Sequence, residues 1–419
     1  MPCALKKIAE NLPMLMKKPF LILVAILLNA FALLLLLFIV DFEINKETEI
    51  EERAEEIAQS KRLKLSFVGD LMCHEPQFTN AKKADGRYDF QPAFRLVSPF
   101  IKQADMAFGN LETVFQGTEL GREYAGYPTF NTPDSYANAL ANTGFDLLFT
   151  ANNHSLDGRA KGVSRTLEIL AENGLQHVGT FTEIAQKNTI QIYDLKNIKF
   201  SVLAYTEHSN GTPSESEQFM LNFIDTAQVR KDIELCRAKG TEIIVLNLHF
   251  GTEYQRVPNE KQKEIVRFAI ECGADIIVGQ HPHVLQPVQR FVGSEKSQLD
   301  TGLVAFSLGN FFSHQLGRYS NAGLILNIEL EKNENTGEIE IINYDGIPTY
   351  TVIYNEQGRN KHLILNSSLA MQRVLPKRLR GKLPKEIDLL SENQFKNMEQ
   401  SYADTDSLFG AFNSDMTLR

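Results

Sequence analysis

Five short polar clusters, each placed directly after a β-branched apolar run, constrain this chain more than any other feature. In order they are Val68-Gly69-Asp70, Asn110-Leu111-Glu112, Asn152-Asn153-His154, His249-Phe250-Gly251-Thr252-Glu253 and His281-Pro282-His283. A polar side chain that ends an apolar run lies at the carboxyl end of a strand, where open α/β sheets form their active-site crevice. We therefore expect the five clusters to converge in space.

The side chains of these clusters are typical ligands of transition metals. Imidazole nitrogen combined with carboxylate and amide oxygen suits Mn, Zn or Fe, whereas an all-oxygen set suits Mg or Ca. The inventory is two carboxylates, one amide and four histidines: Asp70, Glu112, Asn153, His154, His249, His281 and His283. This is too many for one four-coordinate ion, and it fits two ions that share a bridging carboxylate. The clusters predict a hydrolytic centre with two divalent transition-metal ions.

Composition limits the function classes. The 419 residues are 43% hydrophobic, which is enough for a sizeable core in one large domain or two smaller ones. A formal net charge of −9 argues against a nucleic-acid partner, because phosphate contacts need a basic surface. The four cysteines show no CxxC spacing, and we expect Cys236 and Cys272, inside helical patterns, to be buried thiols rather than a disulfide.

Residues 19–40 read PFLILVAILLNAFALLLLLFIV, a run long enough to cross a bilayer as one transmembrane helix. Lysines precede the run and glutamates follow it, so residues 1–18 are expected in the cytoplasm and the rest of the chain outside the cytoplasmic membrane. A cleaved signal peptide is the alternative, but no small-residue cleavage site follows the run. Residues 41–62, rich in Glu, Lys and Ala, are expected to form a solvated stalk.

From residue 63 onward, apolar runs alternate with amphipathic segments, which predicts a layered and partly parallel α/β domain over residues 63–365. Gly69 is expected to let the backbone turn, with Asp70 at the tip of the first strand. The expected helices cover residues 92–103, 133–143, 161–173, 226–239 and 259–272, and a hairpin is expected across Lys196-Asn197. The strands expected at 303–307, 323–330, 339–343 and 349–354 would form a second sheet packed on the first. Residues 366–419 are expected to be a charged, helix-biased extension.

Six pieces in order resemble the CapA-type capsule synthesis family, which is linked to poly-γ-glutamate polymers and belongs to the calcineurin-like metallophosphoesterase superfamily. They are FVGDLM, GNLETV, ANNHSLDGRAKGV, LNLHFGTEY, GADIIVGQHPHVLQP and FSLGNFF, between about residues 63 and 312. The resemblance implies a four-layer α/β/β/α sandwich with a two-metal centre at one edge of the sheets, here preceded by the transmembrane helix.

Position by position, the resemblance implies that Asp70 and His283 bind one ion. It places Asn153, His249 and His281 on the other ion, with Glu112 bridging the two and His154 beside them as general acid or transition-state donor. Two positions depart from the superfamily pattern. Met72 stands where that pattern has a histidine, so the first ion lacks a ligand unless His74 reaches it, and Glu112 stands where most members have aspartate.

Other residues are candidates for holding the ligands or for contacting substrate. Glu253 and Asn310 would orient ligands or only stabilise turns. The arginines of the loops would bind carboxylate or phosphate groups or remain solvated. The candidates for these supporting roles are His74, Asp157, Glu253, Asn310, Arg159 and Arg256, with Arg87 and Arg122 also near the rim. His177, His208, His314 and His362 are expected to be structural or on the surface.

Two functions follow for such a chain. The first is a membrane-anchored, two-metal hydrolase or transferase that acts on an anionic envelope polymer or its phosphorylated precursor. The second is a non-catalytic subunit that binds a nascent anionic polymer, with a metal site that is only structural. The absent histidine at position 72 favours the second, and His154 favours the first, because a structural metal does not need it. Other membrane proteins of polymer synthesis are candidate partners of either form.

Overall fold

The computed structural model describes residues 62–119, 121–374 and 383–410, together with isolated helical positions between residues 26 and 41. Residues 62–419 form one compact unit and residues 1–61 another. None of the helices in the described residues has the length and the apolar character needed to cross a membrane. The predicted cytoplasmic segment (1–18), transmembrane helix (19–40) and stalk (41–62) fall outside the described residues, apart from those isolated positions and residue 62.

The first sheet of the larger unit mixes parallel and antiparallel pairing. Its strand order is β14-β13-β12-β1-β2-β3-β4, and β11 pairs with the end of β1. Strands β1 to β4 are parallel to one another, whereas β12, β13 and β14 join antiparallel. The bounds are β1 (Leu63–Leu71), β2 (Met106–Leu111), β3 (Leu147–Phe149), β4 (Gln176–Val178), β11 (Asn310–Phe312), β12 (Ala322–Lys332), β13 (Ile339–Glu356) and β14 (Arg359–Asn366).

The second sheet has the order β5-β6-β7-β8-β10-β9. Strands β6, β7, β8 and β10 are parallel, and β5 and β9 pair antiparallel at the two edges. As expected, β5 and β6 form a hairpin across Lys196 and Asn197, both of which have a positive φ. The bounds are β5 (Tyr193–Leu195), β6 (Ile198–Thr206), β7 (Ile243–His249), β8 (Ile276–Gln280), β9 (Leu285–Val292) and β10 (Thr301–Leu308).

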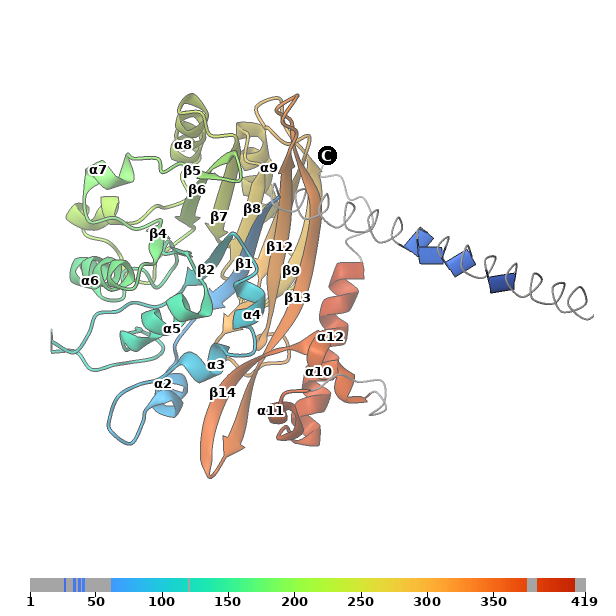
Figure 1. Cartoon of the computed structure of the whole chain (residues 1–419). Helices are drawn as coiled ribbons and strands as arrows, with labels where there is room; N and C mark the ends of the chain where they lie inside the picture. Colours follow the sequence, from blue (N-terminus) through green and yellow to red (C-terminus); the bar gives the residue numbers. More distant parts are fainter. Residues whose placement is uncertain are drawn as a thin grey trace, which may run out of the picture. The chain divides into compact units, whose positions relative to one another are not determined.

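The two sheets pack face to face, and central strands such as β7 and β8 are buried on both sides. Along β7, Ile243 and Val245 belong to the core shared with the first sheet, whereas Ile244, Leu246 and Leu248 belong to a separate core under helices. This alternation follows from the period of two in a strand, and burial on both faces is typical of parallel strands. The mixed α/β fold with two sheets is confirmed (Figure 1).

Helices cover the sheets on their outer faces. Helices α5 and α6 add side chains to the core of the first sheet, and α8 and α9 cover the second. Helix α9 begins at a capping box of Asn259 and Gln262 and ends at Gly273, whose φ of +106° suits glycine. The helices are α2 (Glu75–Ala81), α3 (Gln91–Phe94), α4 (Ser98–Ile101), α5 (Ser135–Thr143), α6 (Arg159–Glu172), α7 (Ile184–Lys187), α8 (Thr226–Ala238) and α9 (Glu260–Cys272), with a 3₁₀ turn at Glu215–Met220.

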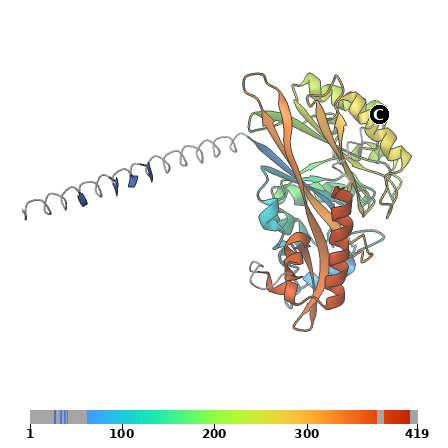
Figure 2. The ribbon, with the colours of Figure 1, turned by 90° about the vertical axis from the view of Figure 1, so that its right-hand side faces the viewer.

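The residues after β14 pack back onto the first sheet. Ile387, Leu390 and Met398 are buried against β13 and β14, and Figure 2 shows α12 running beside these strands. The elements are α10 (Ser367–Met371), a 3₁₀ turn at Gln372–Val374, α11 (Lys385–Asp388) and α12 (Glu392–Gly410). The described part of the segment expected as a charged extension therefore contributes its own apolar core.

Two sequence expectations about element bounds are wrong, and proline explains both. The helix expected at 92–103 is two short helices, α3 and α4, because Pro99 lacks an N–H and starts a new helix. The strands expected at 339–343 and 349–354 are one strand, β13. Pro348 is tolerated there because β14 pairs with β13 only from Thr349 onward, so the missing N–H breaks no ladder on that side.

The arrangement of the strands after His283 also differs from expectation. They do not form a second sheet by themselves. Strands β9 and β10 complete the sheet of β6, β7 and β8, whereas β11 to β14 join the sheet that starts with β1. Both sheets thus contain strands from the two halves of the unit.

Candidate metal centre

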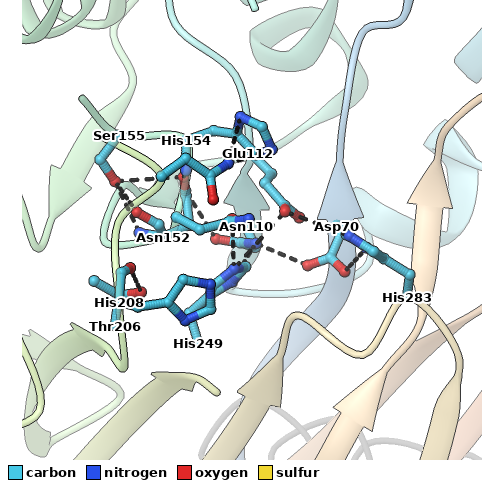
Figure 3. A network of polar contacts seen from close by, with 12 residues as sticks. Asp70, Asn110, Glu112, Asn152, His154, Ser155, Thr206, His208, His249 and His283 are labelled. Carbon is cyan, nitrogen blue, oxygen red and sulfur yellow. Dashed lines mark hydrogen bonds and ion pairs between the residues drawn. The ribbon is translucent and has the colours of Figure 1, made fainter. Parts of the chain in front are cut away.

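The five polar clusters meet where parallel strands of the two sheets end. Asp70 lies in β1, and Glu112 and Asn153 follow β2 and β3. His249 ends β7, and the pair around Pro282 follows β8. Figure 3 shows Asp70, Glu112, His249 and His283 in one polar network, although they come from elements that are far apart in the sequence. The predicted convergence is what the structure has.

Asp70 is held by main-chain and side-chain contacts. Its N–H donates to the carbonyl of Gly309 at 2.9 Å. One buried carboxylate oxygen accepts from Nδ2 of Asn110 at 2.7 Å, and the other accepts from Nδ1 of His283 at 3.0 Å. The role expected of Gly69 is wrong, since it lies within the strand and makes no turn. A Cβ there would lie 1.8 Å from the Gly309 oxygen, so glycine is required by the close approach of two strands.

Glu112 is the central side chain of the site. Its carboxylate is fully buried, and neither oxygen accepts a hydrogen bond from any residue that the structure describes. Oε1 lies 3.7 Å from Nε2 of His249 and 3.6 Å from Nε2 of His283. Burial, and then the charge of Asp70, raise the pKa of this carboxyl well above its usual value. A buried carboxylate without a donor is costly unless a cation compensates it.

The two histidines of the turn after β8 have unusual backbones. His281 has a φ of +97° and His283 a φ of +57°, in the left-handed region that few non-glycine residues adopt. Such strain is found where a structure holds side chains for function. Nδ1 of His283 donates to Asp70 and also lies 3.1 Å from Oδ1 of Asn310. Its other ring nitrogen, Nε2, therefore faces Glu112. This is the orientation that metal-ligating histidines have.

His249 and His281 are neutral at physiological pH. Burial, and then the neighbouring imidazoles, lower the pKa of His249 well below its ordinary value and that of His281 to about 3. Nε2 of His249 lies 2.9 Å from Oδ1 of Asn153, and Nδ1 of His281 is buried without a hydrogen-bond partner among the described residues. Neutral imidazole is the form that binds metal ions, so these pKa values favour ligation.

The donor set fits divalent cations on geometric grounds. In the described residues, the potential ligand atoms of Asp70, Glu112 and His283 lie within 4.8 Å of one another, and so do those of Glu112, His249 and His281. Glu112 is common to both groups. A third group combines Glu253 with His281 and His283. Both main groups include Glu112, whose oxygens have no hydrogen-bond donor among the described residues.

His154 belongs to the same network but is not in any of these groups. Its Nδ1 lies 2.8 Å from Oδ2 of Asp157, which also accepts from the N–H of Phe130 at 2.7 Å. The Phe130 ring packs edge-on against the imidazole, with centroids 4.6 Å apart. When Nδ1 donates to Asp157, Nε2 is the nitrogen available for proton transfer, so Asp157 fixes the tautomer and the orientation of the ring.

The remaining predicted residues are spread around the site. His74 caps α2, where Nδ1 of its ring contacts Gln77 and the N–H of His314, and it is not a member of the ligand groups found in the described residues. Arg159 binds Glu217 and the carbonyl of Thr212, and its side chain is half exposed. Arg256 stacks on Tyr319 and donates to the carbonyl of Asp404 in α12, away from the ligand groups.

Several polar residues around the site were not among the predicted site residues. Asn110 donates to Asp70 and lies 3.2 Å from Nδ1 of His249, so it connects ligands of both groups. Nδ2 of Asn210 lies 3.3 Å from Nε2 of His154, and the His208 ring lies 5.0 Å from that of His281. The position of Asn110 after an apolar run was the available signal for it. His208 and Asn210 lie in a loop with no comparable pattern.

These features define a two-sheet α/β protein with a buried site of carboxylates and imidazoles that can bind metal ions. The model of the family described as bacterial capsule synthesis protein PGA_cap matches residues 64–315. The chain belongs to this family. The resemblance to CapA-type capsule proteins is thereby confirmed.

Relatives and solved structures show how far the similarity extends. The capsule biosynthesis protein CapA of Bacillus anthracis is 27% identical over 270 residues, which cover 61% of this chain and 61% of the relative. The PGA biosynthesis protein CapA of Bacillus subtilis (strain 168) is 28% identical over 293 residues, covering 68% and 71%. The 5'-nucleotidase precursor of Thermus thermophilus has a TM-score of 0.43 at 10% identity, covering 83% of this chain and 59% of that one.

Proposed function

We propose that this chain is a metal-dependent hydrolase or transferase that acts on an anionic envelope polymer of the poly-γ-glutamate type, or on its precursor. The proposal includes a two-metal site and attachment to the outer side of the cytoplasmic membrane through residues 19–40. The observation that carries it is the Glu112 carboxylate, buried without a hydrogen bond and shared by two ligand groups. Membership of a capsule synthesis family, and relatives named for capsule and PGA biosynthesis, support the choice of polymer.

The residues divide between two ions. Asp70, His283 and Glu112 would hold the first, and Glu112, His249 and His281 the second, with Asn153 as a further oxygen donor beside His249. Two such ions lower the pKa of a bound water and neutralise negative charge that develops during attack on phosphorus or carbonyl carbon. Mn, Zn and Fe are the ions that this mixture of ligands suits.

The protein's own residues supply orientation and a proton. His154, aligned by Asp157, would donate a proton from Nε2 to the leaving group. The side chain of Asn210, next to that nitrogen, would hold the ring when no substrate is present. Asn110 keeps Asp70 and His249 in register, since it contacts both.

A non-catalytic role is the second candidate, and one observation favours it. Met72 is buried with 1% of its surface exposed, and His74 is engaged in capping α2, so the first ligand group has no fourth protein side chain from this strand. In this alternative the chain binds the nascent polymer for export or anchoring, and the ions only stabilise the fold.

Metal content tests the site itself. We expect two equivalents of Mn or Zn per wild-type chain and about one in His283→Ala and in His281→Ala. Glu112→Gln should retain neither ion, because Glu112 is the residue common to the two main ligand groups. Elemental analysis of the purified full chain measures this. His177→Gln, a histidine on β4 outside the groups, is the matched control and should keep both ions. Equal loss in His283→Ala and His177→Gln would refute the assignment.

Turnover separates the two functions. With added Mn, we expect wild type to cleave a chromogenic phosphodiester or a γ-glutamyl peptide. His154→Ala should lower kcat about 100-fold or more while its metal content stays at the wild-type value, because general-acid catalysis contributes that much. His281→Ala should lose both activity and one ion. Equal rates in wild type, His154→Ala and His281→Ala would remove the enzyme and leave the binding role.

A further inference from the structure

A basic cavity lies between the end of α2 and the start of β14, outside the candidate metal centre. Its volume is about 260 Å³, and residues 80–84 form one wall. The other wall comes from Arg359, Lys361 and His362 of β14. These three residues lie beyond the segment that the family model matches, which ends at residue 315.

The charge of this cavity is opposite to that of the chain. Lys82, Lys83, Arg359 and Lys361 line it, and Asp89 is the one acidic residue in its lining, whereas the whole chain carries a net charge of −9. Lys83 forms an ion pair with Asp89 at 2.8 Å, and Lys361 forms one with Glu356, which does not line the cavity. Lys82 and Arg359 form no ion pair within residues 62–119, 121–374 and 383–410.

The cavity combines these cations with an apolar lining. Phe90, Pro92, Ala93 and Phe312 contribute carbon surface beneath the charged side chains. Such a mixture suits a ligand that carries methylene groups next to an anionic group, because the carbon surface gains from burial while the cations bind the anion. It is less suited to a chain of phosphates, which has no apolar part. The guanidinium of Arg359 can bind a carboxylate through two hydrogen bonds.

A second cavity continues the first. It has a volume of about 360 Å³ and shares Lys82, Lys83 and Arg359 with its neighbour. Each cavity is near the lower size limit of small-ligand pockets. Two adjoining spaces with a common basic wall therefore fit consecutive units of a chain better than one compact molecule.

Helix α2 runs between the surroundings of the metal centre and the cavity, because the His74 ring at its start contacts Phe130, which in turn contacts His154. This helix begins after His74 and ends at Ala81, so its seven residues span about 10 Å between the two places. A series of histidine contacts joins the same two places. Nε2 of His362 lies 2.9 Å from Nδ1 of His314, and the main-chain N–H of His314 donates to Nδ1 of His74. A γ-linked glutamate repeat has five backbone bonds and extends about 6 Å. About two repeats would reach from His74 to the cavity.

We propose that this cavity is a subsite for the carboxylate groups of an anionic polymer, and that it holds the chain a few units away from the metal centre. The identity of the polymer rests on the proposed function, but the subsite does not require turnover. Lys82 and Arg359 are its main anion ligands, because they have no acidic partner in the described structure. The apolar lining receives the methylene groups of the repeat.

Binding of a fluorescent γ-linked glutamate decamer to the full chain tests the proposal. Fluorescence anisotropy is measured with a chelator present, so that metal ions cannot bridge the partners. Lys82→Gln/Arg359→Gln should weaken binding about tenfold or more, the effect of losing a charge-assisted hydrogen bond, and should reduce the salt dependence. The matched control is Lys231→Gln/Lys239→Gln, two exposed lysines of α8 and its C-cap, which lowers the net charge equally and should bind within about twofold of wild type.

The outcomes distinguish this proposal from the proposed function. Glu112→Gln should lose metal and turnover and still bind the decamer as wild type does, which supports the subsite whether or not the chain is an enzyme. Equal affinity of the cavity variant and wild type overturns the proposal, as does an equal loss in the α8 control. Polyphosphate of the same charge that displaces the decamer as well as unlabelled γ-glutamate would overturn the carboxylate assignment. If wild type does not bind the decamer, the proposed subsite is also overturned.

Discussion

Three histidines outside the ligand groups, His74, His314 and His362, form a chain of contacts between the metal centre and the basic cavity. Burial lowers the pKa of His362 to about 3 and that of His74 to about 4, and it also lowers the pKa of His314. All three are therefore neutral in the folded chain at physiological pH. In the unfolded chain a histidine takes up a proton near pH 6.5.

This difference predicts a loss of stability in mild acid. A histidine whose folded pKa is lowered contributes its full stability above pH 6.5, and the contribution is lost as the pH falls toward the folded pKa, because only the unfolded chain binds the proton. For His362 the loss between pH 7 and pH 5 is about 2 kcal/mol. We expect His362→Gln to flatten the pH dependence of the free energy of unfolding by about this amount, measured by urea denaturation with chelator present.

The comparison of slopes removes the effect of altered packing. His362→Gln also removes the interaction of the ring with Nδ2 of Asn80 at 3.1 Å, which lowers stability at every pH and is measured at pH 8. Only the difference between the free energies of unfolding at pH 8 and pH 5 reports proton uptake by this histidine. Parallel curves for wild type and His362→Gln would show that this imidazole is protonated in the folded chain.

At the scale of elements, glycine allows strands to approach closely just before the metal ligands in both sheets. A Cβ on Gly69 would lie 1.8 Å from the carbonyl oxygen of Gly309, and a Cβ on Gly279 would lie 2.0 Å from that of Phe306. The first position precedes Asp70 and the second precedes His281 by two residues. The ligands of each sheet thus depend on a backbone contact that no other residue type permits.

Gly69→Ala should both destabilise the chain and weaken the metal site. The added methyl group cannot fit against the Gly309 carbonyl, so β1 must shift, at a cost of about 3 kcal/mol or more. Asp70 would move with it, and less metal should be retained. Gly162→Ala in α6 is the matched control, because its methyl group meets no atom within 4 Å and should stabilise the helix by about 0.5–1 kcal/mol. Similar thermal unfolding and metal content in the two variants would contradict this account.

Sequence patterns predicted individual elements better than their arrangement. Apolar runs ending in polar residues located β1, β2, β3, β7 and β8 and therefore the convergence of their ends. They did not show that β9 and β10 pair with β8 while β12 pairs with β1, because strand partners depend on contacts between distant residues. The turn predicted at Gly69 was wrong for a similar reason. The sequence does not reveal that the backbone at Gly309 packs directly against this glycine.

The site was predictable where chemistry limits the residue type. Histidine and carboxylate at strand ends indicated metal binding, and the structure brings Asp70, Glu112, His249, His281 and His283 within ligand distance of one another in overlapping groups. Asn210 and His208 were not predicted, because asparagine and histidine in a loop have many ordinary roles. The pairing of His154 with Asp157 is a local contact that follows from their spacing once the backbone between them turns.

At the scale of the whole molecule, the family-matched segment is not a structural unit by itself. It ends at residue 315, but β1 pairs on one side with β12, from Leu63 opposite Leu330 to Val68 opposite Ile325. The strand that holds Asp70 therefore lies at the centre of its sheet only when residues 322–332 are present. Strands β13 and β14 extend the same sheet further.

Truncation tests this dependence. A chain that ends at residue 315 should fail to fold, because the apolar β1 would become an exposed edge. A chain that ends at residue 374 keeps β12, β13 and β14 and should fold with reduced stability, since Ile387, Leu390 and Met398 no longer cover their part of the core. Circular dichroism and limited proteolysis distinguish the two. A cooperative thermal transition in the shorter chain would show that β12 is dispensable.

The pairing of β1 with β12 also sets the order of events during synthesis. Ser66 and Asn327, which share a buried hydrogen bond across these strands, are 261 residues apart. At the usual elongation rates a ribosome needs roughly 15–50 s to make the intervening chain. During that interval the edge of β1 that faces β12 has no partner, so an apolar strand edge stays exposed until residues 322–332 have been made.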